Sequence, residues 1–94
     1  MNEKRKERLA AFVRETLPDF LRFDCGFAND ILVSIIHVEP NEASSKVKVY
    51  ISVWPDDKRD EVANTLKMSE NKAKHYIRER ISSKYSPLIS FYVK

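Results

Sequence analysis

The sequence of 94 residues contains one cysteine and two histidines, which limits its redox and metal chemistry. The single cysteine, Cys25, cannot form an internal disulfide. Cysteine and histidine together offer three ligands, one fewer than a closed structural zinc site uses. We therefore expect a reduced, cytoplasmic protein that holds neither a metal nor another cofactor.

Long apolar runs are also missing from the sequence. The longest, residues 31–36, is short and contains Ser34, so no segment is expected to cross a bilayer. The apolar segment after the charged amino terminus contains Arg14 and Glu15, which argues against a secretory signal peptide. At this length we expect one domain, residues 1–94, with a single small core.

Neither sign of charge dominates, but the basic residues are unevenly distributed. The chain has 17 basic and 14 acidic residues, a formal net charge of +3. Residues 67–84 contain six basic side chains against two acidic ones, which indicates a surface for a polyanion such as nucleic acid. A solvated helix face would give the same pattern. The six are Lys67, Lys72, Lys74, Arg78, Arg80 and Lys84.

Three segments have the composition of β-strands. Residues 31–39 are β-branched and apolar on both parities, which predicts a strand covered on much of both faces. Residues 46–54 alternate strictly between apolar and polar side chains, and we expect them to pair with residues 31–39 in an antiparallel hairpin. Residues 88–93 (LISFYV) follow Pro87, and their apolar and aromatic composition predicts a third strand. The expected core includes Phe12, Val13, Val47, Val49, Ile51, Ile77, Ile81 and Phe91.

Apolar residues at helical spacing predict a helix over residues 3–17. The apolar stripe continues past Pro18, so we expect the helix to kink there or to restart with Pro18 in its first turn. Residues 23–30, which include the only glycine, are expected to form a loop.

A second helical region, residues 58–84, contains a break. Asp56 and Asp57 offer an N-cap at its start. At the break, Ser69 can cap a new helix, and Asn71 tolerates a left-handed backbone. We therefore predict an α+β domain of order α-β-β-α-kink-α-β, with a three-stranded sheet and helices packed on one face.

This order is that of a type II KH-like domain, and two segments narrow the resemblance. Residues 33–53 are similar to the strand, turn and strand of the ribosome-binding factor A family, with Val38-Glu39 and the run SKVKV (45–49) in the family's places. Residues 86–92 (SPLISFY) look like the family's Pro-x-Leu-x-Phe strand. The resemblance extends over nearly the whole chain.

The sequence departs from these patterns at the kink. KH domains hold nucleic-acid backbone with a Gly-x-x-Gly loop, and this chain has no glycine after Gly26. The ribosome-binding factor A family has an Ala-x-Gly kink instead, and Ser69, Glu70 and Asn71 occupy that place. Serine and asparagine can serve the same backbone geometry.

The resemblance implies a non-catalytic RNA-binding factor that associates with the small (30S) ribosomal subunit or its precursor. It would assist late assembly and the maturation of 16S ribosomal RNA. We expect a monomer with no membrane partner. Residues that match the kink and the helix after it would face the RNA: Ser69, Glu70, Asn71, Lys72, Lys74, His75 and Arg78.

Charge extends the candidate surface beyond the kink. The additional residues are Lys67 and Lys84, and Lys4, Arg5 and Lys6 in an amino-terminal cluster that a frayed terminus would also explain. Lys72, Lys74 and Arg78 are expected to share a solvent-facing surface because Ala73, Ile77 and Ile81 point at the sheet.

Other interpretations stay open at this point. The chain could be a small α+β protein-interaction module without RNA binding, using an exposed strand or the basic helix. Tyr50 and Trp54, on the polar parity of residues 46–54, could stack on bases or pack on neighbouring elements, and Lys46 and Lys48 share their face.

Enzymatic activity is not expected. Nucleophilic catalysis would have to pair Cys25 with His37 or His75, and nothing around Cys25 resembles a nucleophile turn. The acidic pairs near residues 56–61 are better explained as partners of a helix dipole.

Overall fold

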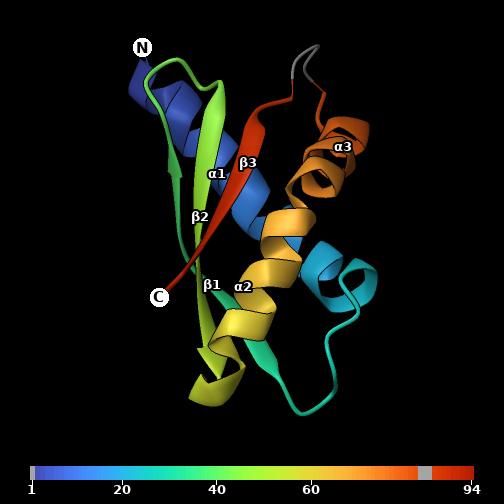
Figure 1. The fold of residues 1–94 in the computed structure, drawn as a ribbon. Coiled ribbons are helices and arrows are strands. Elements are labelled where there is room, and N and C mark those ends of the chain that lie inside the picture. The colour runs from blue at the N-terminus through green and yellow to red at the C-terminus, as the bar shows by residue number, and fades with distance from the viewer. Residues whose placement is uncertain (1, 83–85) are drawn as a thin grey trace.

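The computed structural model describes residues 2–82 and 86–94, and the elements follow the predicted order (Figure 1). Within these two ranges, no helix combines the length and the apolar character needed to span a membrane. The elements are α1 (Asn2–Asp19), the π-helical η1 (Phe20–Asp24), β1 (Leu32–Pro40), β2 (Lys46–Trp54), the 3-10 turn η2 (Asp56–Lys58), α2 (Arg59–Met68), α3 (Glu70–Arg80) and β3 (Leu88–Val93).

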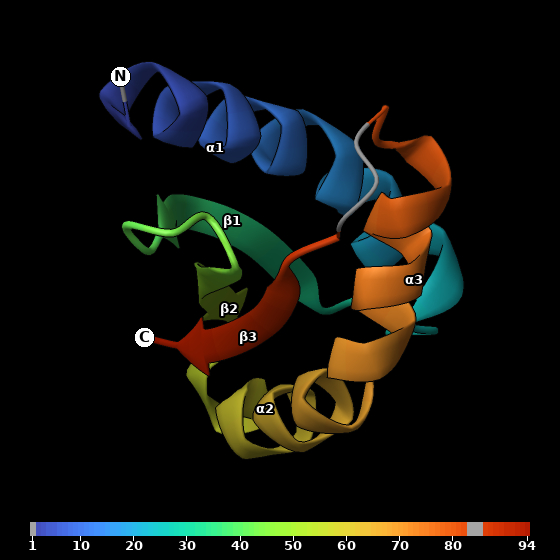
Figure 2. The same ribbon diagram turned by 90° about the horizontal axis from the view of Figure 1, so that it is seen from above.

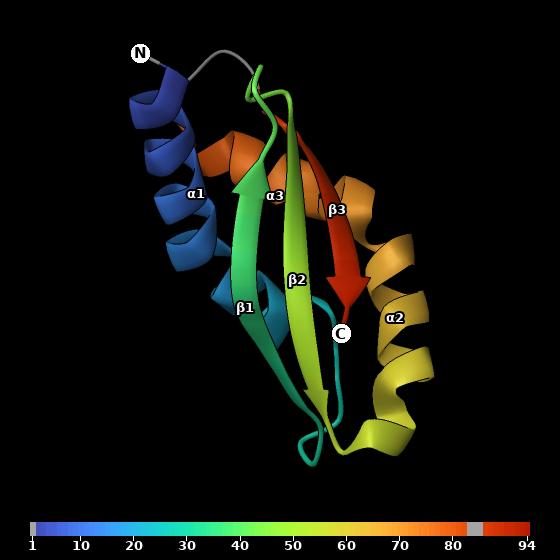
Figure 3. The same cartoon turned by 90° about the vertical axis from the view of Figure 1, so that its left-hand side faces the viewer.

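The sheet has the strand order β1-β2-β3, so β2 lies in the centre. β1 runs antiparallel to β2, as predicted, and β3 runs parallel to β2. The helices lie on one face of the sheet and the other face is uncovered (Figures 2 and 3). The predicted α+β, KH-like arrangement is confirmed.

The alternation of β2 separates the two faces of the sheet. Val47, Val49 and Ile51 are fully buried beneath the helices, whereas Lys46 and Lys48 are exposed, which confirms the predicted register. Five further side chains were expected in this core, and Val53 joins them. Val13 and Ile77 are fully buried, Val53 is buried, and Phe12, Ile81 and Phe91 pack at its edge.

Three helix boundaries differ from the sequence prediction. The helical region expected over residues 58–84 ends early, because α3 stops at Arg80 and Ile81 has an extended backbone (φ −85°, ψ 143°). α1 continues through Pro18 without a new start and changes to π-helical geometry at Phe20, so the loop begins only after Asp24. Proline lacks the N–H that would continue the α-helical hydrogen bonds, which favours a change of pattern at this point. The expected acidic N-cap of α2 is wrong, because Asp56 and its neighbour form η2 and Lys58 takes the cap position without a side-chain hydrogen bond.

A β-bulge at Ile36 explains why β1 is apolar on both parities. Ile35 pairs with Ile51 and His37 pairs with Tyr50, so Ile36 has no partner in β2. The inward positions therefore change parity at the bulge, from odd-numbered residues before it to even-numbered residues after it. Leu32 and Ile36 are 62% and 54% exposed, so the expectation that both faces of this strand are covered is wrong.

The bulge predicts that a deletion at this position is tolerated. Removing Ile36 joins Ile35 to His37, whose partners Ile51 and Tyr50 are already consecutive, so every inward side chain keeps its direction. The deletion variant should retain a cooperative thermal transition by circular dichroism. Deletion of Val49 from β2 is the matched control and should abolish it, because half of that strand would reverse its faces. Loss of folding in both variants would contradict this account of the strand.

Candidate nucleic-acid interface

The predicted kink is present and lies at Ser69, between α2 and α3. The Ser69 backbone has φ −99° and ψ 1°, a bridge conformation that does not require glycine. Its hydroxyl donates a hydrogen bond of 2.7 Å to the carbonyl of Thr65, an interaction that bends helices. Asn71 lies inside the first turn of α3 and is helical. The expectation of a non-helical backbone at or beside Asn71 is therefore wrong: the non-helical residue is Ser69, two positions earlier, and it accommodates the turn alone.

The α3 helix presents most of the predicted residues to solvent. Ala73 and Ile77 are fully buried against the sheet, whereas Asn71, Lys72, His75 and Arg78 are exposed. Lys74 is half-buried, one turn before Arg78. Lys72 lies roughly 120° around the helix axis from Arg78. The cations therefore border one broad exposed surface and do not form a tight row.

Glu70 differs from the other predicted residues because it turns inward. Its carboxylate accepts a hydrogen bond of 2.9 Å from the backbone N–H of Phe91 in β3. β3 is an edge strand, and this bond satisfies a donor that no neighbouring strand can pair. The Ser86 hydroxyl also donates to the carbonyl of Lys74, at 2.9 Å, so the two contacts fix α3 against the middle of β3 and the segment just before it.

This geometry assigns Glu70 a structural contribution that substitution can measure. Glu70→Ala should lower the free energy of unfolding by about 1–3 kcal/mol, because the Phe91 N–H loses its acceptor. Glu70→Gln keeps a carbonyl acceptor and should lose less than half as much in urea unfolding. The control, Glu79→Ala on the exposed side of α3, should change stability by less than about 0.5 kcal/mol. Equal losses for Ala and Gln at position 70 would argue against the hydrogen bond.

The additional basic residues fall into separate groups. Lys67 is exposed in the last turn of α2, just before the kink. Lys4 and Arg5 are exposed on α1. Lys6 forms a 2.9 Å ion pair with Glu42, and this hydrogen bond raises the pKa of its ammonium group. Lys84 lies outside the described residues.

Folding brings the amino-terminal cluster close to the end of α3. Arg5, Arg8 and Arg80 line one groove of about 870 Å³. The Arg80 guanidinium lies 3.5 Å from the centre of the Tyr76 ring and donates to the Tyr76 carbonyl at 3.0 Å. Arg80 therefore covers Tyr76, which packs at the edge of the core. The grouping of Arg80 with Arg8 was not predicted, since no sequence signal links residues so far apart.

Cys25 lies beside the kink and is half-buried. Burial raises the pKa of its thiol, the nearby Asp24 adds to the rise, and a hydrogen bond with Ser69 and the charge of Lys72 oppose it. The thiol is therefore protonated near neutral pH, which is unfavourable for a nucleophile. Among the described residues, no group of three His, Cys, Asp or Glu side chains could hold a metal ion.

The raised pKa of Cys25 predicts a loss of stability in alkaline solution. The unfolded thiol ionises near its ordinary pKa of 9.0, and the folded thiol ionises at higher pH. The unfolded state therefore loses its proton first, and the free energy of unfolding should fall as the pH rises above about 9. Urea titrations of the wild type and of Cys25→Ser at several pH values isolate this effect. A wild-type decline that the serine variant reproduces in full would exclude Cys25 as its source.

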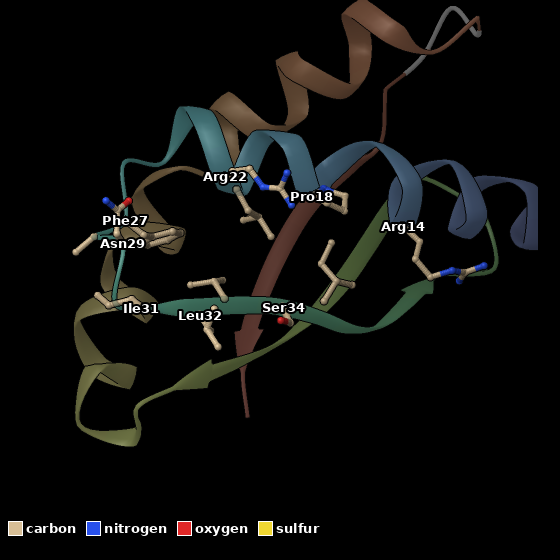
Figure 4. A pocket seen from close by; sticks show the side chains of 12 residues that line it. Arg14, Pro18, Arg22, Phe27, Asn29, Ile31, Leu32 and Ser34 are labelled. Atoms are coloured by element: carbon tan, nitrogen blue, oxygen red, sulfur yellow. The ribbon is translucent and has the colours of Figure 1, made fainter.

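A second groove follows the outer edge of β1, with a volume of about 570 Å³ (Figure 4). This side of β1 pairs with no strand of the described sheet, so its backbone groups could accept an extended peptide. The lining residues include Arg14 and Pro18 of α1, Arg22 of η1, Ile31 just before β1, and Leu32 and Ser34 at the start of β1.

The element order, the mixed three-stranded sheet and the kinked helix pair define a type II KH-like domain. A sequence model of ribosome-binding factor A matches residues 5–94. Ribosome-binding factor A of Caldicellulosiruptor bescii is 33% identical over 97 aligned positions, which cover 97% of this chain and 72% of that protein. The chain belongs to the ribosome-binding factor A family.

Solved structures share the fold. A candidate ribosome-binding factor A from Thermotoga maritima, solved by NMR, superposes with a TM-score of 0.77 at 23% identity, over 94% of this chain and 85% of that one. The crystal structure of ribosome-binding factor A from Thermus thermophilus gives 0.74 at 16% identity, over 94% of each chain. A homology model of the Thermus thermophilus protein, fitted into a cryo-EM map of a 30S complex, gives 0.73 at 14% identity over 88% of each chain.

Proposed function

We propose that this protein is a non-catalytic RNA-binding factor that associates with the small (30S) ribosomal subunit or its precursor. It assists late assembly and the maturation of 16S ribosomal RNA in the cytoplasm, and acts as a monomer whose residues 1–94 form one domain. Family membership supports this proposal. The structural neighbour fitted into a 30S complex supports the choice of partner.

The charge of the kink and of α3 is the observation that carries the proposal. Between positions 67 and 78 the only acidic side chain is Glu70, and its carboxylate is occupied by β3. Lys67, Lys72 and Arg78 are exposed on the remaining surface, so this region is cationic without an acidic residue of its own to neutralise it. Such a surface suits phosphate contacts, which fix a protein on nucleic acid without reading its sequence.

The protonated state of the Cys25 thiol supports a role without catalysis. Cys25 is held as a thiol beside the kink, and His37 and Tyr50 stack on the sheet face that the helices leave uncovered. Binding and positioning of RNA need neither a thiolate nor a general base, and the cationic surface is sufficient for them.

The groove at the β1 edge favours a second candidate function, that of a protein-interaction module. An extended segment of a partner protein could add to β1 next to Arg14 and Arg22. The two functions differ in their response to salt. Phosphate contacts lose affinity steeply as salt rises, whereas an interface built on backbone hydrogen bonds and apolar contacts does not.

Charge reversal at two exposed positions tests the proposed RNA surface. Lys72→Glu combined with Arg78→Glu should leave the fold intact, because exposed charges contribute little to stability. Affinity for immature small subunits should fall at least about tenfold, and the slope of log affinity against log salt should flatten by about 0.7–0.9 per lost phosphate contact. Quantitative co-sedimentation over a salt series measures both.

The matched control is Lys58→Glu combined with Arg59→Glu, which changes the net charge equally at the start of α2, outside both α3 and the groove at the β1 edge. It should lose much less affinity. If both double variants weaken binding to the same extent, the effect comes from net charge and not from α3. If the α3 variant binds as tightly as the wild type, the RNA contacts do not lie on this helix.

A further inference from the structure

Three aromatic rings cross the uncovered face of the sheet in one row. His37 of β1, Tyr50 of β2 and Tyr92 of β3 occupy adjacent register positions on the three strands. The centres of the His37 and Tyr50 rings lie 5.7 Å apart, and those of Tyr50 and Tyr92 lie 5.6 Å apart, with interplanar angles of 26° and 30°. We call these three residues the aromatic row. Figure 3 shows the face of the sheet on which it lies.

Lysine side chains lie along both sides of the aromatic row. The Lys48 ammonium group is 5.9 Å from the centre of the Tyr92 ring, and that of Lys94 is 4.9 Å from the centre of the Tyr50 ring. Lys46 is exposed on the same face. At the outward positions of the three described strands there is one acidic residue, Glu39, which accepts a hydrogen bond of 3.2 Å from the Tyr50 hydroxyl. The face therefore combines π surfaces with a net positive charge.

The described chain leaves this face open to solvent. Tyr92 is 45% exposed, and Trp54, further along β2 on the same face, is 64% exposed. Tyr50 packs on the rings of both neighbouring strands, which is one of the two alternatives left open by the sequence, but the outward side of the row has no cover from the described helices. A contiguous group of large exposed side chains rimmed by charge is typical of an interaction surface.

The combination of aromatic rings and lysines indicates which kind of ligand this face binds. Bases stack on aromatic side chains irrespective of sequence, while lysines follow the phosphates. In a double helix the faces of the bases are already stacked on one another, so only single-stranded nucleic acid can use the rings. A protein partner would have to cover at least three lysine ammonium groups, which protein interfaces generally avoid at their centre.

We propose that the uncovered sheet face, centred on the aromatic row, is a second RNA site that binds a single-stranded segment by stacking. The inference rests on the proposed function in taking RNA as the ligand, and uses a different surface. α3 packs on the opposite face of the sheet, so the protein contacts RNA on two sides (Figure 2). The cations of α3 contact phosphates, and the aromatic row holds unpaired nucleotides.

Trp54 provides the assay, because it is the only tryptophan of the chain and lies on the proposed site. Addition of a ten-nucleotide oligouridylate should quench its fluorescence, and a duplex RNA of the same length should quench it far less. Tyr92→Phe keeps the ring and should retain the affinity. Tyr92→Leu keeps apolar bulk without a ring and should weaken binding about tenfold, the effect expected for one lost base stack.

The α3 variant with Lys72→Glu and Arg78→Glu separates the two proposals. It should still show quenching by oligouridylate, because the aromatic row is unchanged. The inference is overturned if oligouridylate leaves Trp54 unquenched, if the Phe and Leu variants bind equally, or if duplex RNA quenches as strongly. It is also overturned if Trp54 becomes buried on raising the concentration of the protein alone, which would identify a second copy as the occupant. None of these results bears on binding of the α3 surface to immature subunits.

Discussion

Burial of alternate side chains along the central strand is the interaction on which the rest of the structure depends. Val47, Val49 and Ile51 are fully buried, and each such side chain contributes about 1.5–3 kcal/mol by leaving water. β2 pairs with a strand on each side, so its alternation sets the register of both neighbours. The helices therefore cover one face, and the lysines and aromatic rings of β2 necessarily lie on the other.

The sequence predicted those features that depend on local periodicity. The strict alternation of residues 46–54, the order of elements and the break after α2 are all confirmed, because each follows from patterns of two or 3.6 residues. The bulge at Ile36 and the inward turn of Glu70 depend on partners far along the chain, in β2 and β3. The aromatic row likewise requires the parallel pairing of β3 with β2, which no local pattern indicates.

The candidate surface on α3 was predictable for the same reason. Once Ala73 and Ile77 pack on the sheet, the residues that flank them, Lys72 and Arg78, face solvent, whereas Lys74 is half-buried. The carboxylate of Glu70 accepts a hydrogen bond from the Phe91 N–H of β3, so it is not free to neutralise the lysines next to it on the kink and α3. One hydrogen bond thus both protects the edge of β3 and makes the neighbouring surface more cationic.

We propose that this protein binds the small ribosomal subunit during its maturation through contacts with RNA. Sedimentation of the purified protein with immature and with mature small subunits, over a series of salt concentrations, tests it most directly. We expect preferential binding to immature subunits, with an affinity that falls steeply as salt rises. Equal binding to both particles, or an affinity that does not change with salt, would contradict it.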